Sequence, residues 1–250
     1  APEKLDLQGL YRRIWQGSFP KLADDPEMDH DLFYGSYINT YLERDVRILG
    51  QIGDLQRFFR FLRAAAARTG QLLNYSDLAR DADVAVGTAK NYLSILIASG
   101  LVTLLEPYFA NRTKRMTQAP KLYFLDTGLC AYLTDWSSPE TLEAGAIAGH
   151  IFETWCFAEI LKSYRNSGKR PAFYFYRDFD QVEIDLVIEQ DGVLYPVEMK
   201  KSSDPGRDAA KHFSKLEKFG KKIGMGAVVC MVRESSPLTR ECKLIPAASL

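Results

Sequence analysis

The chain has 250 residues, and its 32 Lys and Arg residues balance its 32 Asp and Glu residues, so the formal net charge is zero. This length allows two or three domains, and any nucleic-acid-binding surface must be local because the overall charge attracts nothing. Four scattered cysteines and three histidines argue against a zinc site and for reduced thiols in a cytoplasmic protein. No apolar run approaches the roughly 18 residues of a membrane span. The chain opens on Ala1 rather than Met, which is typical of a piece of a longer protein.

Residues 1–53 are predicted to be a helical segment. Helical spacing over Leu5 to Trp15 ends at Gly17, a usual stop signal. The stretch from Phe33 to Val46 places an aromatic stripe on one face, which is typical of a helix that faces a core. The glycine-rich loop of a P-loop ATPase is absent from the sequence, so we expect no ATP binding by this chain alone.

Residues 54–125 have the pattern of a winged helix, in which three helices are followed by a two-stranded wing. Ser76 is predicted to cap the second helix, and Gly100 to end the third. The predicted helices span Leu55 to Ala67, Asp77 to Ala82 and Val86 to Ser99, and the predicted strands span Leu101 to Leu105 and Lys121 to Leu125.

In DNA-binding proteins of this shape, the third helix reaches base edges and basic side chains hold phosphates. The polar face of that helix and the loop of the wing supply the candidate DNA-binding residues Thr88, Lys90, Asn91, Arg112, Lys114 and Arg115. The acidic helix before it and the single cation of the third helix fit a protein-binding winged helix equally well, since a fold does not fix a function.

From residue 126 the pattern changes. Residues 126–139 are predicted to be a linker with a short helix, and residues 140–250 an α/β domain. Its first helix, Ala146 to Tyr164, is apolar almost all round but carries Glu153, which has no cation three or four residues away. A carboxylate on a buried helix needs a partner elsewhere. Three strands, a basic helix near Arg207 to Phe219 and a further strand are predicted to follow, the strands at Ala172–Tyr176, Glu183–Glu189, Val193–Met199 and Ala227–Val232.

The second and third of these strands are predicted to form a hairpin, because Asp191-Gly192 suits a two-residue type I′ turn. Cross-strand partners then have residue numbers that sum to 383. This register places Asp185 opposite Glu198 and Glu183 opposite Lys200. Strict alternation puts these four charged side chains on one face, and on the other the apolar set Ile184, Leu186, Ile188, Tyr195, Val197 and Met199.

Facing carboxylates with Cβ atoms about 4.5–5.5 Å apart repel each other. A divalent cation held by their oxygens would offset that repulsion, and Lys200 lies beside Glu198 on the same face. The alternative is a solvated hairpin face on which Glu183 and Lys200 form an ordinary ion pair of small energetic value.

The order helix, three strands, helix, strand, with Glu153, Asp185 and Glu198-x-Lys200 at these positions, resembles the PD-(D/E)xK nuclease superfamily, and archaeal Holliday-junction resolvases in motif layout. The resemblance implies an α+β chain that ends in a restriction-endonuclease-like domain. It implies that Asp185 and Glu198 bind Mg²⁺ or Mn²⁺, that Glu153 completes the acidic cluster and that Lys200 positions or activates the attacking water. Ile184 stands where the strictest pattern has Pro.

A second resemblance covers nearly the whole chain. It rests on the fragments GSFP (17–20), YINTYLERDV (37–46), GTAKNYLSIL (87–96), PKLYFLDTGL (120–129) and GHIFETW (149–155). These are similar to bacterial and archaeal AAA-type ATPases, in which an N-terminal P-loop domain precedes a C-terminal domain of unknown function. The resemblance implies that ATP binds only in an N-terminal domain absent from this chain, and that this domain is a partner.

Two hypotheses of function follow. In the first, the chain is a Mg²⁺-dependent DNA nuclease region that a winged helix directs to its substrate. In the second, the nuclease fold is catalytically silent and acts as a DNA- or protein-binding regulatory module of the ATPase. DNA is the expected partner and no membrane is expected. The sequence leaves the oligomeric state open, a homo-oligomer included.

Overall fold

The computed structural model describes residues 7–25, 27–41, 44, 52–109 and 119–250. The α-helices are α1 (Leu7–Gln16), α2 (Pro20–Asp24), α3 (His30–Thr40), α5 (Leu55–Ala66), α6 (Tyr75–Ala82), α7 (Val86–Ala98), α9 (Thr127–Leu133), α10 (Pro139–Ala144) and α11 (Ala148–Asn166), and the 3₁₀ helices are η2 (Arg207–Ala210), η3 (Phe213–Phe219) and η4 (Ala247–Ser249). Among the helices so described, none is both long and apolar enough to cross a membrane.

The strands of the described residues form one mixed ten-stranded sheet with the order β1-β3-β2-β4-β5-β6-β8-β10-β9, and β7 pairs with β6. Their bounds are β1 (Gln71–Leu72), β2 (Val102–Pro107), β3 (Lys121–Phe124), β4 (Ala172–Arg177), β5 (Glu183–Gln190), β6 (Val193–Lys200), β7 (Lys222–Ile223), β8 (Gly226–Cys230), β9 (Ser236–Thr239) and β10 (Cys242–Pro246). The prediction of an α+β chain is confirmed at this level.

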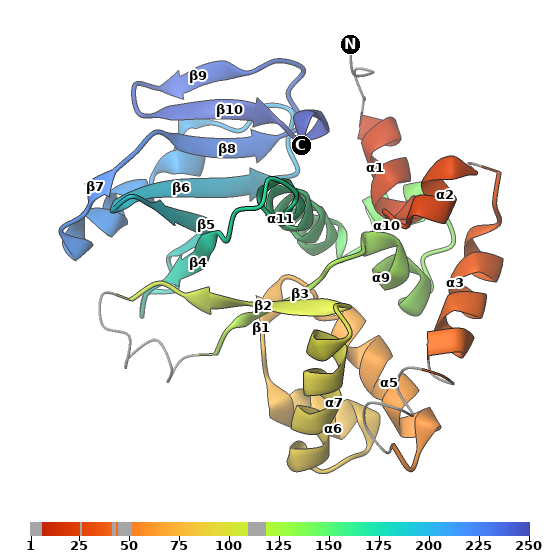
Figure 1. Cartoon of the computed structure of the whole chain (residues 1–250). Coiled ribbons are helices and arrows are strands. Elements are labelled where there is room, and N and C mark those ends of the chain that lie inside the picture. The colour runs from red at the N-terminus through yellow and green to blue at the C-terminus, as the bar shows by residue number, and fades with distance from the viewer. Residues whose placement is uncertain (1–6, 26, 42–43, 45–51, 110–118) are drawn as a thin grey trace.

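The sheet runs without interruption from the first half of the chain into the second (Figure 1). The link is a short parallel pairing of β2 with β4, in which Glu106 lies opposite Tyr174 and Pro107 opposite Phe175. The regions 54–125 and 140–250, which the sequence predicts as separate domains, therefore share backbone hydrogen bonds.

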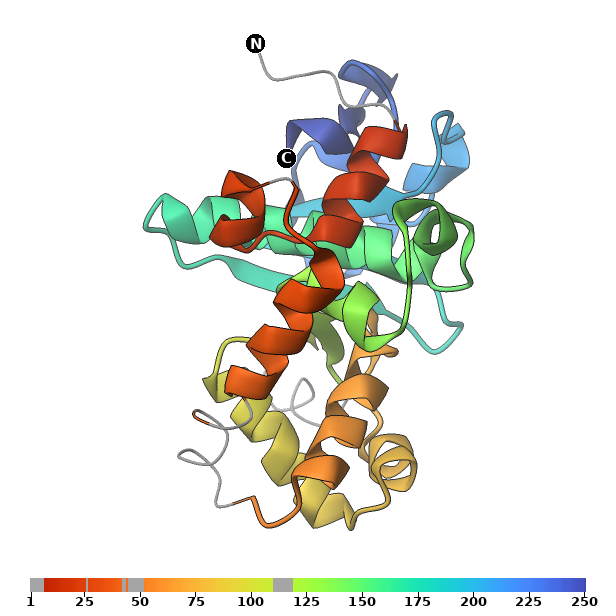
Figure 2. The same cartoon turned by 90° about the vertical axis from the view of Figure 1, so that its right-hand side faces the viewer.

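Helical layers cover both faces of the sheet around β5 and β6. On one face Phe152 of α11 belongs to the same buried cluster as Leu186, and this cluster extends through α1, α3, α5, α7 and α9. On the other face Phe213 of η3 belongs to a second cluster with Ile184. Figure 2 shows α1 and α2 in front of α11, so this part of the N-terminal segment covers the outer side of that helix.

Asp126 anchors the N-terminal segment. Its carboxylate accepts hydrogen bonds from the backbone N–H groups of Ser18 and Leu129, each at 2.7 Å, and from the hydroxyls of Tyr34 (2.8 Å) and Ser18 (3.1 Å). Four donors satisfy a buried carboxylate without a cation. All residues of α9 but Tyr132 are buried, so residues 126–133 belong to the core rather than to a linker.

A β-bulge interrupts β5 beside the predicted site. In the pairing with β4, Val187 lies opposite Tyr174 but Ile184 lies opposite Tyr176, so β5 carries one extra residue. The predicted face of Ile184, Leu186 and Ile188 is therefore wrong. Leu186 and Ile188 pack on the α11 side, whereas Ile184 packs on the η3 side.

Other local predictions also need correction. The second helix of the region 54–125 is capped by Asn74, whose side chain accepts from the N–H groups of Ser76 (3.0 Å) and Asp77 (3.2 Å), and not by Ser76. The basic helix predicted near Arg207 to Phe219 is two 3₁₀ helices, η2 and η3. The hairpin of β9 and β10 was not predicted, since polar and charged residues dominate the stretch around its turn.

Candidate functional site

The hairpin of β5 and β6 has the predicted turn and register. Asp191 and Gly192 both have positive φ, at 53° and 76°, as a type I′ turn requires. Every pair from Gln190–Val193 to Leu186–Val197 has residue numbers that sum to 383. Asp185 and Glu198 are the next residues along each strand, and both are buried.

Three of the predicted site residues meet at this end of the hairpin. The Nζ of Lys200 lies 2.7 Å from Oε2 of Glu198 and 4.0 Å from Oδ2 of Asp185. Oδ2 of Asp185 also accepts a hydrogen bond of 2.8 Å from the backbone N–H of Met199, which fixes this carboxylate across the hairpin. Asp185 and Glu198 are 8% and 3% exposed, while the side chain of Lys200 is 45% exposed, so the cation lies on the solvent side of two buried acids.

The pKa of Glu198 is shifted by its burial and by the nearby carboxylate of Asp185. Burial and the nearby Asp185 carboxylate raise the pKa of Glu198 from 4.5 to about 9, although its ion pair with Lys200 acts in the opposite direction. Burial alone would lower the pKa of Lys200, but Asp185 and Glu198 raise it. Burial and the Asp185 charge together therefore outweigh the single ammonium of Lys200 at Glu198.

Glu153, the fourth predicted residue, is held by partners that the sequence did not reveal. Its Oε1 accepts hydrogen bonds from Nζ of Lys121 (2.8 Å) and from the hydroxyl of Tyr123 (2.5 Å), both on β3. Lys121 is 2% exposed and also lies 2.5 Å from Oε1 of Glu183. Burial and Asp185 raise the pKa of Glu153 to about 7, against the effect of Lys121 and Tyr123.

The ion pair between Glu183 and Lys200, which the alternative interpretation of the hairpin requires, is absent from the described residues. Glu183 binds Lys121, and its Oε2 also lies 2.9 Å from Nη1 of Arg177 on β4. Lys200 binds Glu198 instead. The bulge in β5 accounts for this difference, because it changes the face on which the residues before Leu186 lie.

The structure leaves Asp185 and Glu198 as the two candidate metal-binding carboxylates, rather than three. Within the described ranges, no three His, Cys, Asp or Glu side chains form a group that could hold a metal ion. Glu153 lies near enough to Asp185 for their charges to interact, but its carboxylate is engaged by Lys121 and Tyr123. Asp185 and Glu198 nevertheless fit Mg²⁺, which is often held by one or two carboxylates and keeps several waters.

The helix α7, which carries Thr88, Lys90 and Asn91, lies at the opposite end of the molecule from β9 and β10 (Figure 1). On α7, Lys90 and Asn91 are exposed and Thr88 is half-buried, in the orientation that the helical spacing predicts. Arg112, Lys114 and Arg115 lie outside the described residues.

Sequence reasoning missed Lys121 and Tyr123 because it assigned β3 wholly to the wing. A signal was present. Lys121 stands at the head of the apolar run Leu122-Tyr123-Phe124, where a buried ammonium requires a carboxylate, and Glu153 stands in an apolar helix, where a buried carboxylate requires a cation. Matching these two unpartnered charges would have paired β3 with α11.

Comparison with known families finds two matches, one in each half of the chain. Residues 7–140 match the family described as domain of unknown function DUF8612, and residues 148–250 match the one described as domain of unknown function DUF4143. The chain belongs to the DUF8612 family. Lys121 and Tyr123 lie in the DUF8612 region, whereas Glu153, Asp185 and Glu198 lie in the DUF4143 region.

Relatives of the chain include uncharacterized proteins of Mycobacterium tuberculosis and Mycobacterium bovis, each 32% identical over 195 residues. The match covers 77% of this chain but 43% of each relative, so the chain spans less than half the length of these proteins. No solved structure matches the chain. Because Lys121 lies in the DUF8612 region and Glu153 in the DUF4143 region, their ion pair joins the two regions.

We expect Lys121→Met to destabilise the protein by about 3–5 kcal/mol, because it leaves the carboxylates of Glu153 and Glu183 without their shared buried cation. Urea unfolding of the parent and the variant measures this loss. In a double-mutant cycle, Glu153→Gln should cost much less in the Lys121→Met background than in the parent. Additive losses would contradict the buried ion pair.

Glu198 predicts a pH dependence of stability in metal-free protein. The folded-state pKa of about 9 lies above the ordinary 4.5, so the folded state holds a proton that the unfolded state releases in this range. The free energy of unfolding should therefore fall as pH rises from about 5 to 9, by as much as about 1.4 kcal/mol per pH unit. Urea titrations in EDTA should show this slope in the parent and a flatter one in Glu198→Gln. Equal slopes would refute the assignment to Glu198.

Proposed function

We propose that this chain is the DNA-binding, Mg²⁺-dependent nuclease region of a larger AAA-type ATPase, and that it hydrolyses DNA phosphodiesters. The observation that carries the proposal is the buried pair of Asp185 and Glu198 with Lys200 at 2.7 Å from Glu198. Two buried acids that share one cation are electrostatically unfavourable unless a proton or a further cation binds, and hard carboxylate oxygens suit Mg²⁺ or Mn²⁺.

In this proposal each residue has a distinct task. Asp185 and Glu198 would hold the metal ion, which when bound polarises a phosphate and lowers the pKa of a coordinated water. The ammonium of Lys200, exposed beside the pair, would contact the phosphate oxygens and stabilise negative charge that develops there. Glu153 would act as a positioning residue, because its carboxylate is already bonded to Lys121 and Tyr123.

The region 54–125 would direct this site to DNA as a winged helix. Its element order supports the proposal, since α5, β1, α6, α7 and the antiparallel pair β2–β3 follow one another as that fold requires. Lys90 and Asn91 on the exposed face of α7 are the candidate base and phosphate contacts.

A catalytically silent nuclease fold is the second candidate. It is favoured by the engagement of Glu153 with Lys121 and Tyr123, which leaves two carboxylates for a metal ion where the resemblance implies three. In that case the chain would regulate the ATPase through DNA or protein binding.

Asp185→Asn separates the two candidates, because it removes the negative charge that a metal ion needs. The Asn oxygen can still accept the hydrogen bond from the N–H of Met199, so the fold is kept. If the pair holds a metal ion, Mn²⁺ at about 100 times its Kd should stabilise the parent by about 2.7 kcal/mol, and Asp185→Asn should lose this effect together with cleavage of branched or single-stranded DNA. Without metal, the variant should be at least as stable as the parent, because repulsion is relieved.

Thermal unfolding with EDTA and with Mn²⁺ measures both effects. Glu189→Gln is the matched control, since it removes a carboxylate from the same strand at its pair with Lys221 and should keep the Mn²⁺ effect. A parent whose melting temperature ignores millimolar Mn²⁺, together with a destabilised Asp185→Asn, would exclude the nuclease.

The wing gives an independent test of DNA binding. Replacing Arg112, Lys114 and Arg115 by Ala should weaken binding to all duplex sequences and reduce the slope of log affinity against log salt by up to about 2.7. Fluorescence anisotropy with duplex and branched DNA at several salt concentrations measures this slope. If the triple variant binds like the parent, the wing contacts a protein partner instead.

A further inference from the structure

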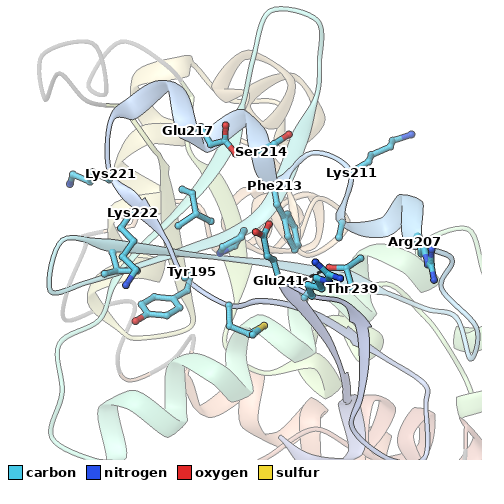
Figure 3. Close-up of a pocket in the computed structure, with 18 residues that line it drawn as sticks. Tyr195, Arg207, Lys211, Phe213, Ser214, Glu217, Lys221, Lys222, Thr239 and Glu241 are labelled. Atoms are coloured by element: carbon cyan, nitrogen blue, oxygen red, sulfur yellow. Dashed lines mark hydrogen bonds between the residues drawn. The ribbon is translucent and has the colours of Figure 1, made fainter.

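A cavity of about 800 Å³ lies away from the acidic site, between the start of β6, the 3₁₀ helices η2 and η3, β7 and the turn from β9 to β10 (Figure 3). The rings of Tyr195 and Phe213 line it. Each ring packs against a glycine, since a Cβ on Gly224 would lie 2.3 Å from Cε1 of Tyr195, and one on Gly226 would lie 2.6 Å from Cε2 of Phe213. The two rings are therefore held by close backbone contact.

The segment 207–222 that borders this cavity has six Lys and Arg residues and two Asp and Glu residues. In a chain of zero net charge, this is a strong local excess of positive charge. Cations that face β4 and β5 have partners in the fold: Lys218 donates a 2.7 Å hydrogen bond to the hydroxyl of Tyr176, and Lys221 forms an ion pair with Glu189.

Apart from Lys221, the cations that line the cavity have no such partners within the described ranges. Arg207, Lys211, Lys222 and Arg240 are all exposed and line it, and across the described residues none of the four side chains has a hydrogen bond or ion pair. Four unpartnered cations around one cavity leave a surface that favours a negatively charged ligand.

The arrangement of these cations selects the kind of anion. Figure 3 shows Arg207 and Lys211 on one side of the cavity and Lys222 on the other, with Glu217 and Glu241 among the residues between them. A single phosphate contacts one side, and the two carboxylates repel it from the middle. An extended polyanion can contact both sides of the rim at once.

We propose that this rim, formed by Arg207, Lys211, Lys222 and Arg240, binds the phosphodiester backbone of a DNA strand. The proposal rests on the proposed function, because β6 joins the cavity at Tyr195 to the acidic site at Lys200, five residues further along the strand and about 16 Å away. A strand of DNA that crosses the rim reaches the acidic site within a few nucleotides. The half-buried ring of Tyr195 can stack on a base.

The experiment compares two double variants that remove the same charge. Lys211→Ala/Arg240→Ala should weaken binding of a 30-nucleotide single strand and a 30-base-pair duplex, and reduce the salt slope by about 1.4 and about 1.8. The control Arg63→Ala/Lys162→Ala removes one Arg and one Lys that have carboxylate partners, Asp135 and Glu159, and should leave the slope unchanged. Binding is measured in EDTA by fluorescence anisotropy.

Glu241→Gln provides a change of the opposite sign. It removes a carboxylate from the cavity, so it should tighten DNA binding, whereas a merely structural disturbance would weaken it. An unchanged salt slope in Lys211→Ala/Arg240→Ala, an equal loss in the control, or equal displacement of the DNA by polyglutamate would overturn the proposal. EDTA prevents cleavage, so this binding test does not depend on catalysis. If the rim binds DNA but Mn²⁺ does not stabilise the protein against unfolding, the nuclease proposal is refuted and the rim proposal is supported.

Discussion

A buried ammonium, that of Lys121, holds together the part of the molecule in which the candidate site lies. It contacts carboxylates from α11 and from β5, so one side chain on β3 fixes a helix and a strand that are far apart in the sequence. An ion pair in the core contributes little net stability when compared with apolar packing, but it is costly to break. Lys121 therefore specifies how these elements fit together more than it adds to the total free energy of folding.

The consequence for the site is an uneven distribution of charge. Lys121 and Arg177 together supply two positive charges to Glu153 and Glu183, while Lys200 alone is left with Asp185 and Glu198. The acids with a buried cation are well satisfied, and the pair at the end of the hairpin is not. Under the proposed function, this unbalanced pair is where a divalent cation would bind, and the exposed ammonium of Lys200 lies on its solvent side.

Local signals in the sequence carried much of this arrangement. The Asp191-Gly192 turn specified the register of the hairpin, because both residues must tolerate positive φ. Helix spacing located α5, α7 and α11 to within a few residues, and the acid pair followed from the register.

What the sequence could not supply was long-range. The bulge in β5 leaves no mark on the alternation of apolar residues, so Ile184 was assigned to the wrong face and Glu183 to the wrong partner. The pairing of β2 with β4, which joins the two parts of the sheet, is encoded by no local pattern. The segment 207–219 forms two short 3₁₀ helices instead of one α-helix, and the amino-acid composition does not distinguish these two backbone geometries.

The shared sheet also bears on where the molecule can be divided. The boundary between the two family matches falls at residues 141–147. A fragment that starts at residue 148 would keep every candidate metal ligand, yet it would lose Lys121 and Tyr123 and expose the edge of β4. Glu153 and Glu183 would then lack the cation that both of them contact. Measurements on such a fragment would therefore describe a site that lacks the ammonium of Lys121, and would not represent the DUF4143 region as it is in the whole chain.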